Sequence, residues 1–360
     1  MAIRGGLGLL AGLYDGGLTA YLAAERVGLR RRTHLPIPVV SVGNLSVGGT
    51  GKTPMTILLG RMLEAAGLRV AILSRGHGGA SHETRVVSSG DGAVLLSPSD
   101  AGDEPVLLAA SLRNIPVVVG KDRRLSGREA MRRWPLDVVV LDDGFQYWQL
   151  FRDLDIVLLD SRYPFENGHP LPRGLLREPA RNLGRAGIVV VTRASRLGVD
   201  ITARERIVSQ VKEFTPQAGI YFSDHIASCL VRVDGGDGWT STQTEDLDHL
   251  NGRLVVAVSA IAQPQSFIET LMSATQCQLV AAISRDDHST FGHNDIADIL
   301  EKAIGLGAEA IVMTEKDAVK WREASPNLEL PVFALRITMK IERQHEFFEE
   351  VLKRSGIVAV

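Results

Sequence analysis

Residues 41–54, SVGNLSVGGTGKTP, have the residue types and spacing of a phosphate-binding loop. An apolar strand precedes them and a helix follows, so the backbone N–H groups of the glycine-rich turn would point at phosphate oxygens. The candidate nucleotide-contacting residues of the turn are Ser46, Gly48, Gly49, Thr50 and Gly51. Lys52 would neutralise the β- and γ-phosphates, and the Thr53 hydroxyl would coordinate Mg²⁺. Ser46 stands where the strict G-x-x-x-x-G-K-[ST] pattern has glycine, which changes the entry of the loop but not the groups that touch phosphate.

Two acids follow a second apolar strand, in DVVVLDDGFQ at residues 137–146. Because the carboxyl ends of parallel strands meet at one edge of a sheet, Asp142 and Asp143 are expected beside the loop. One of them can bind Mg²⁺ directly and the other through water. The sequence does not decide which acid is the direct ligand.

A third group of acids begins a helix, in AGDEPVLLAA at residues 101–110. Asp103 and Glu104 stand at its start, and Pro105 lies in its first turn. In a phosphotransferase, an aspartate in this position can accept the proton of the attacking hydroxyl. The alternative is an ordinary helix cap.

Further polar residues gather in RDDHSTFGH at residues 285–293. The residues that could do chemistry here are Asp286, Asp287, His288 and His293. A histidine that orients a carboxylate is the preferred interpretation, and a metal site or a loop histidine without catalytic function are the alternatives.

Basic side chains are concentrated in GKDRR at 120–124 and LPRGLLREP at 171–179. They could bind the phosphates of a nucleotide or of its acceptor. They are Lys121, Arg123, Arg124, Arg173 and Arg177. A solvated charged face is the alternative for each group.

The elements that position these residues follow from the apolar pattern. Short, nearly continuous apolar runs predict strands buried on both faces of a parallel sheet. The predicted strands are 37–42, 70–73, 117–119, 137–142, 155–160 and 188–192, with a second set at 254–259, 310–314 and 332–335. Helical stretches at 53–66, 104–112 and 121–133 alternate with the first set, which indicates a doubly wound α/β fold of the P-loop NTPase type.

The organisation expected along the chain has five parts. They are an N-terminal amphipathic helix over 1–32, a P-loop domain over 33–225, a linker or β-ribbon over 226–250, a smaller α/β domain over 251–338 and a C-terminal helix over 339–360. The turn-rich VDGGDGW at 233–239 marks the break between the two strand sets.

The first 32 residues form an amphipathic segment with a basic end. An apolar stripe at helical spacing is formed by Leu7, Leu10, Tyr14, Leu18 and Tyr21, and arginines follow at positions 26 and 30–32. Asp15 and the many glycines argue against a membrane-spanning helix, so we expect a helix that lies on a membrane surface. A helix docked on the protein's own core is the alternative.

Composition limits the remaining possibilities. The chain has 360 residues, which suits one large or two medium α/β domains. A net charge of −2 offers no overall field for nucleic acid, and no obligatory protein partner is expected. Cys229 and Cys277 lack metal-site spacing, which fits a reducing compartment and argues against a zinc cluster.

Taken together, the motifs resemble one family, the tetraacyldisaccharide 4'-kinases of lipid A biosynthesis. The matching segments are GNLSVGGTGKTP 43–54, SRGHGG 74–79, GDEP 102–105, DR 122–123, LDDGFQ 141–146, LPRGLLREP 171–179, DHSTF 287–291 and TEKDAVK 314–320. They occur in the family's order through most of the chain. Other P-loop kinases share only the first segment and the paired acids, so the combination is specific.

The resemblance implies transfer of the γ-phosphate of ATP, with Mg²⁺, to the 4'-hydroxyl of a tetraacylated disaccharide 1-phosphate, giving lipid IVA. The family's catalytic aspartate falls on Asp103 and the histidine that tunes it on His288. Glu104 is expected to assist this aspartate, and Lys52 keeps its P-loop role. The metal-side residues fall on Thr53, Asp142 and Asp143. Arg123, Arg177, Asn44 and Gln146 are expected to bind substrate. The lipid-linked acceptor implies a peripheral enzyme on the cytoplasmic face of a bacterial inner membrane.

Two positions depart from the family's pattern. Tyr147 follows DDGFQ where histidine is common, and His77 stands in SRGHGG where tyrosine is common. A role assigned to either family side chain therefore does not transfer. The role of 314–320 is also open between nucleotide contact and a link between domains.

Two other functions are consistent with the loop alone. A P-loop enzyme acting on a soluble metabolite would need no amphipathic start. A P-loop ATPase switch would have no use for Asp103 and His288 as an acceptor-activating pair.

Overall fold

The computed structural model describes residues 2–26, 29, 31–80, 83–198, 200–233, 243–287, 289–324 and 329–358. The α-helices in these ranges are α1 (Ala2–Arg26), α2 (Lys52–Ala65), α3 (Pro98–Ala101), α4 (Asp103–Ser111), α5 (Arg123–Arg133), α6 (Ile201–Phe214), α7 (Pro264–Ala274), α8 (His293–Gly305), α9 (Glu315–Ala324) and α10 (Gln344–Ser355). Short 3-10 helices are η1 (Ala180–Arg185), η2 (Ala194–Leu197) and η4 (Leu247–Leu250). The strands are β1 (Val39–Asn44), β2 (Val70–Ser74), β3 (Arg85–Ser89), β4 (Pro116–Val119), β5 (Val138–Asp142), β6 (Leu154–Asp160), β7 (Ile188–Thr192), β8 (Gly219–Arg232), β9 (Thr244–Glu245), β10 (Leu254–Ser259), β11 (Gln278–Ser284), β12 (Ala310–Thr314) and β13 (Val332–Ile341).

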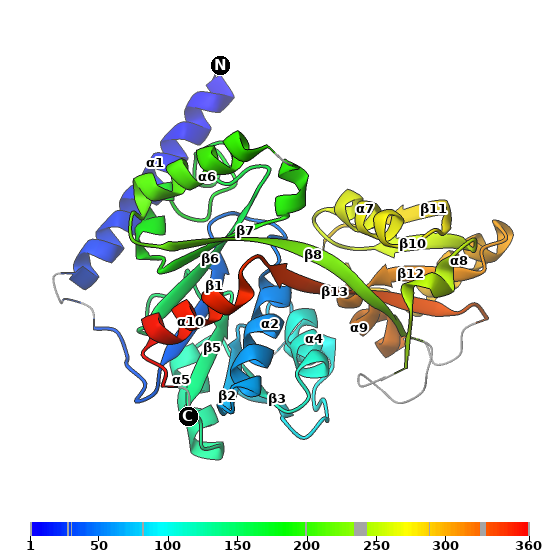
Figure 1. Ribbon diagram of the computed structural model, residues 1–360, viewed down its shortest axis with the longest axis horizontal. Coiled ribbons are helices and arrows are strands. Elements are labelled where there is room, and N and C mark those ends of the chain that lie inside the picture. Colours follow the sequence, from blue (N-terminus) through cyan, green and yellow to red (C-terminus); the bar gives the residue numbers. More distant parts are fainter. Residues whose placement is uncertain are drawn as a thin grey trace. The chain divides into compact units, whose positions relative to one another are not determined.

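These elements, most of which are labelled in Figure 1, form two compact units. The first unit comprises residues 1–74, 122–224 and 340–360, and the second comprises residues 75–121 and 225–339. β8 and β13 each begin in one unit and end in the other. The compact units therefore divide the chain differently from the linear boundaries expected above, which placed residues 75–121 with the P-loop. The reason is that α4 packs against α9, a helix more than 200 residues later in the chain.

The first unit contains a parallel sheet in the order β8-β7-β6-β1-β5-β2. Every residue of β1, β2, β5, β6 and β7 is buried, as the continuous apolar runs predicted. Ile207 and Val211 of α6 join the apolar cluster formed by β6 and β7. The predicted doubly wound α/β fold is confirmed.

The carboxyl end of β1 packs closely against the turn after β5. A Cβ atom added at Gly43 would lie 2.5 Å from Cβ of Phe145 and 2.9 Å from its backbone nitrogen. Phe145 is itself fully buried, so it has no room to yield. This glycine lets the two strand ends that carry the loop and the paired acids approach each other.

The second unit contains the parallel strands β11-β10-β12-β13 and the antiparallel pair β3–β4. Trp321 of α9 is fully buried in its core, and its ring lies 5.5 Å from that of Phe291. Since α9 also packs against α4, this core fixes α9 in front of the acids at the start of α4.

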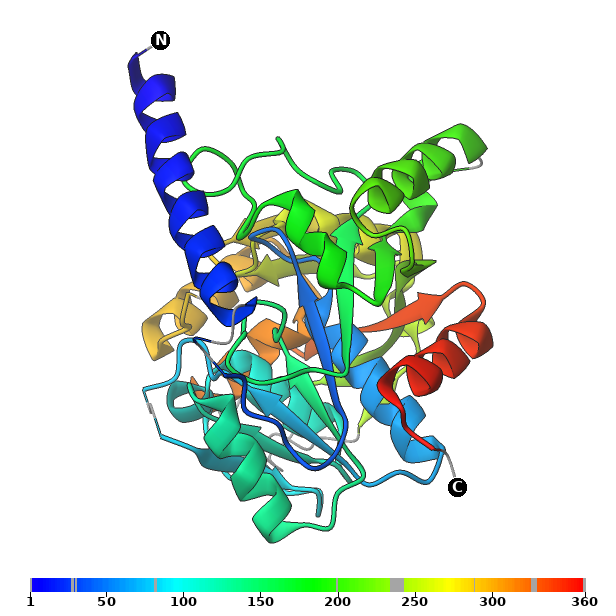
Figure 2. The same ribbon diagram turned by 90° about the vertical axis from the view of Figure 1, so that its left-hand side faces the viewer.

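Helix α1 lies against the first unit, and its N-terminal turns extend beyond the rest of that unit (Figures 1 and 2). Leu18 is buried, and the ring of Tyr21 lies 5.2 Å from that of Trp148. The C-terminal part of the predicted apolar stripe therefore packs on the protein through Leu18 and Tyr21. Leu10 and Leu13, in contrast, are 53% and 66% exposed.

We expect Gly43→Ala to destabilise the fold by about 1–3 kcal/mol, because the added methyl group overpacks a fully buried contact. Chemical denaturation followed by tryptophan fluorescence measures the change. Gly17→Ala on α1 is the matched control, since a Cβ there meets no atom within 4 Å. Equal stability of the Gly43 variant and the wild type would contradict the close approach.

Candidate active site

The phosphate-binding loop joins β1 to α2, and its backbone requires glycine at two positions. Gly48 has φ of 121° and Gly51 has φ of 92°, a region that other residues rarely adopt. A Cβ added at Gly48 or Gly49 meets no atom within 4 Å, so the loop borders open space. Gly51 is the N-cap of α2, which places Lys52 and Thr53 in the first turn as expected. This geometry suits a bound anion at a helix N-terminus.

Ser46 has a structural reason to differ from glycine. It forms an antiparallel bridge with Leu176. On either side of it, the N–H of Val47 donates to the carbonyl of Leu175 at 2.7 Å, and the N–H of Arg177 donates to the carbonyl of Leu45 at 2.7 Å. The entry of the loop is therefore an extended segment paired with residues 175–177, a conformation that a β-carbon tolerates.

Asn44, the last residue of β1, supports the loop through a side-chain hydrogen bond. Its side chain is fully buried, and its Nδ2 donates to Oγ1 of Thr50 at 2.9 Å. The carbonyl of Asn44 accepts a hydrogen bond from Nε2 of Gln146 at 2.9 Å. Both residues thus contact the loop or the strand that leads into it, and their expected binding of substrate stays a prediction.

The carboxylate of Asp143 lies between two cations. Nη1 of Arg177 donates to its Oδ1 at 2.9 Å and its Oδ2 at 2.8 Å, and Nζ of Lys52 lies 3.7 Å from Oδ1. Burial alone would raise the pKa of Asp143, but the charges of Lys52 and Arg177 outweigh it and hold the pKa below its ordinary value. The carboxylate is therefore ionised at neutral pH.

Asp142 is buried beside it and held by hydroxyl groups. Oγ1 of Thr56 on α2 donates to its Oδ1 at 3.0 Å, and Oγ of Ser74 on β2 donates to its Oδ2 at 3.2 Å. Asp142 thus accepts from two hydroxyl groups, whereas Asp143 pairs with two cations. The two carboxylates are donors that fit Mg²⁺, because that ion binds one or two carboxylates and completes its shell with water and phosphate. The Thr53 hydroxyl stays a predicted third donor.

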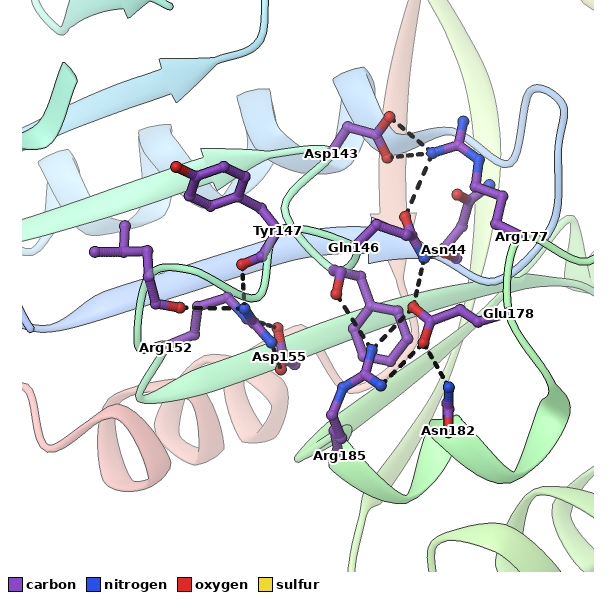
Figure 3. Close-up of polar contacts among 12 residues, drawn as sticks. Asn44, Asp143, Gln146, Tyr147, Arg152, Asp155, Arg177, Glu178, Asn182 and Arg185 are labelled. Atoms are coloured by element: carbon purple, nitrogen blue, oxygen red, sulfur yellow. Dashed lines mark hydrogen bonds and ion pairs between the residues drawn. The ribbon is translucent and has the colours of Figure 1, made fainter. Parts of the chain in front are cut away.

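Figure 3 shows the contacts of Glu178, which directly follows the residues that pair with the entry of the loop. Glu178 is fully buried, and its two oxygens accept hydrogen bonds from Nη1 and Nη2 of Arg185, each at 2.9 Å. Its Oε1 also accepts from Nε2 of Gln146 at 2.9 Å, and its Oε2 from Nδ2 of Asn182 at 2.8 Å. A buried carboxylate that is fully paired in this way holds its neighbour Arg177 in register with the loop.

Arg123 and Tyr147 form one group. The guanidinium of Arg123 lies 4.0 Å from the centre of the Tyr147 ring, and the Tyr147 hydroxyl donates to Oδ1 of Asp122 at 2.8 Å. Arg123 is buried and adds to the positive field at Asp143. The tyrosine that departs from the family's pattern therefore orients Arg123 by stacking.

The other predicted basic residues have separate places. Arg124 pairs with Asp122 at 2.6 Å, and Arg173 lies against Gly8 of α1. Lys121 stands in the second unit, immediately before the boundary at residue 122.

Arg193 is a residue that the sequence reasoning missed. It follows β7 with φ of 58°, pairs with Asp160, and its Nη2 donates to the carbonyl of Gly49 at 2.7 Å. It therefore holds the tip of the loop. The signal that could have found it is the rule already used for the acids, a polar residue just past the carboxyl end of a buried strand.

In the second unit, Asp103 is 6% exposed at the first position of α4. Gly102, with φ of 91°, packs on the carbonyl of His77 in the SRGHGG segment, which fixes the start of the helix. Nζ of Lys316 and Nζ of Lys320 each lie 3.8 Å from Oδ2 of Asp103. The expected acid is thus in a cationic environment made by α9.

Lys316 also faces Glu104 and Asp287, each at 3.5 Å. Burial alone would lower the pKa of Lys316, but the carboxylates of Asp103, Glu104 and Asp287 outweigh it and hold the pKa above its ordinary value. The residues of the 285–293 motif therefore separate. Asp287 joins this cluster, His293 begins α8, and His288 lies outside the described residues.

The chain matches the model of the tetraacyldisaccharide-1-P 4'-kinase family over residues 5–355. It belongs to that family. A curated tetraacyldisaccharide 4'-kinase of Syntrophus aciditrophicus is 42% identical over 90% of this chain and 86% of its own, and one of Geobacter sulfurreducens is 38% identical over 93% and 88%. The solved structure of LpxK from Aquifex aeolicus, described as an apo form in complex with ATP, is 29% identical and covers 98% of this chain and 99% of its own, with a TM-score of 0.76. The family predicted from the motifs is confirmed.

The contribution of the Tyr147 ring, which stacks on Arg123, can be separated from that of its hydroxyl, which bonds to Asp122. We expect Tyr147→Phe to keep most activity and Tyr147→Ala to lose it about 10-fold, because a partly desolvated cation–π contact contributes about 1–2 kcal/mol. Steady-state kinetics on both variants provide the test. Equal loss in the two variants would assign the effect to the hydrogen bond with Asp122 instead.

Proposed function

We propose that this protein phosphorylates the 4'-hydroxyl of a tetraacylated disaccharide 1-phosphate with ATP and Mg²⁺, in the biosynthesis of lipid A. The observation that carries the proposal is family membership over nearly the whole chain, joined to a loop and an acid group with the chemistry of phosphoryl transfer. The Aquifex relative described in complex with ATP supports ATP as the donor.

The first unit would bind the nucleotide. The N–H groups of residues 48–51 and the first turn of α2 suit the phosphates, and Lys52 adds a positive charge near them. Thr53, Asp142 and Asp143 would hold Mg²⁺, which neutralises charge that develops on the transferred group. Arg177 and Lys52 keep Asp143 ionised for this purpose.

Asp103 would accept the proton of the acceptor hydroxyl. It has the properties of a general base, since it is buried, fixed at a helix start and surrounded by cations that favour its ionised form. His288 remains a proposed tuning residue by resemblance, and Glu104 a proposed helper.

The N-terminal helix would bring the enzyme to the cytoplasmic surface of the bacterial inner membrane, as a peripheral protein. Among the described helices, α1 is long and apolar enough, over Gly6–Ala24, to cross a membrane by length and composition. However, Asp15 pairs with Arg181, and the Tyr14 hydroxyl donates to the carbonyl of Arg177 at 2.7 Å. These contacts favour a helix attached to the first unit that presents Leu10 and Leu13 to lipid.

Incubation with labelled ATP, Mg²⁺ and tetraacyldisaccharide 1-phosphate in detergent micelles tests the function. We expect labelled lipid from the wild type, and a turnover about 10²–10⁴-fold lower from Asp103→Asn, because the variant cannot take up the proton. Asp298→Asn, an exposed acid of α8 in the same unit, is the matched control. Absence of labelled lipid would reject the function, and ATP turnover that continues unchanged in Asp103→Asn without lipid product would favour an ATPase switch.

Membrane attachment is tested by sedimentation with anionic phospholipid vesicles. We expect the double variant Leu10→Asp, Leu13→Asp to bind at least about tenfold more weakly, since it loses apolar burial and gains repulsion from the lipid. The control variant Ile201→Asp, Val358→Asp adds the same charge at two exposed apolar positions of the first unit. Equal binding by both double variants would show that the exposed face of α1 does not meet the membrane.

A further inference from the structure

The TEKDAVK segment at residues 314–320 is the matching motif whose role the sequence left open. Helix α9 begins within it, and Thr314 acts as the cap: the N–H of Asp317 donates to Oγ1 of Thr314 at 3.1 Å, and that hydroxyl donates to Oδ2 of Asp317 at 2.6 Å. Asp317 is fully buried and also accepts from the N–H of Ala260 at 2.9 Å. The start of α9 is therefore anchored to the end of β10.

This anchor aims two lysines at the same carboxylate. Lys316 and Lys320 are four residues apart and so lie on one face of α9. Each ammonium group is 3.8 Å from Oδ2 of Asp103. Glu315, which points elsewhere, pairs instead with Arg336 at 2.8 Å.

Lys320 is held more rigidly than a surface lysine. It is 7% exposed, its Nζ lies 3.1 Å from Oδ1 of Asp317, and it donates to the carbonyl of Ser289 at 3.0 Å. A buried ammonium group is costly unless it is paired, and here two carboxylates and a carbonyl pair it. Its place beside Asp103 is thus fixed by groups on three segments of the second unit.

We propose that Lys316 and Lys320 are positioning residues for the phosphotransfer reaction, which hold the carboxylate of Asp103 ionised and in one orientation. The inference rests on the proposed function, because it assigns Asp103 the role of proton acceptor. In this role the two lysines act through Asp103 and not by contact with substrate. Glu104, Asp287 and Asp317 also pair with the lysines and hold them in place beside Asp103.

The test compares removal of charge with its retention. We expect Lys316→Met and Lys320→Met to lower kcat by about 10–100-fold, the effect of losing one charge-assisted contact, with the KM for ATP unchanged. Lys316→Arg should recover most of kcat, because it keeps the positive charge. Lys302→Met, an exposed lysine of α8, is the matched control.

The pH dependence of kcat provides a readout that a purely structural role would not move. Without one lysine, protonation of the Asp103 carboxylate becomes easier, so the acid limb of the profile should shift to higher pH in both methionine variants and return in Lys316→Arg. The charged groups that face this carboxylate or its two lysines are Glu104, Asp287, Lys316, Asp317 and Lys320.

The outcomes are distinguishable. If the wild type gives no labelled lipid, the proposed function fails. If the wild type is active and both methionine variants keep its kcat and acid limb, the inference about the lysines is wrong while the function stands. A fall in kcat that is accompanied by a lower melting temperature, an unshifted acid limb and no recovery in Lys316→Arg would also overturn it, because it would assign α9 a packing role only.

Discussion

The placement of the Asp143 carboxylate between Lys52 and Arg177 is the interaction on which the first unit's site depends. A half-buried carboxylate is unfavourable alone, and two cations on different segments make it favourable. One cation belongs to the phosphate-binding loop and the other to the segment that pairs with the loop's entry. The same charge pattern therefore joins the loop, the end of β5 and residues 175–177 into one structure.

Further contacts fix the segments on either side of this carboxylate. The buried Glu178 fixes the residue next to Arg177, and Arg193 holds the carbonyl of Gly49 from the end of β7. On the outer side, α1 is bonded to the same segment through Tyr14 and Asp15. A helix that we propose to meet lipid is thus two hydrogen-bonded steps away from a proposed metal-binding acid.

The second unit contains a buried carboxylate, that of Asp103, which is paired with two lysines of α9. In the proposed reaction the buried carboxylate of Asp103 accepts a proton and so has to be ionised, and α9 brings two ammonium groups to within 3.8 Å of it. Those charges are themselves buried, so the unit includes Asp287 and Asp317 to compensate them. The result is a densely paired cluster, in which removal of either lysine leaves carboxylates without compensation.

The sequence by itself determined the parallel sheet, the loop, the paired acids and the family, because each depends on residues close together in the chain. Apolar runs such as 137–142 and 188–192 specify buried strands locally, and Gly48 and Gly51 specify the turn. The strands that escaped prediction, such as β3 and β8, have polar residues within them and depend on their neighbours in the sheet. Only the tertiary structure decided that α4 belongs with α9, that Asn44 and Gln146 support the loop, and that Lys316 and Lys320 face Asp103. Such pairings join segments up to about 200 residues apart, and their energies come from burial and charge compensation that no local pattern encodes.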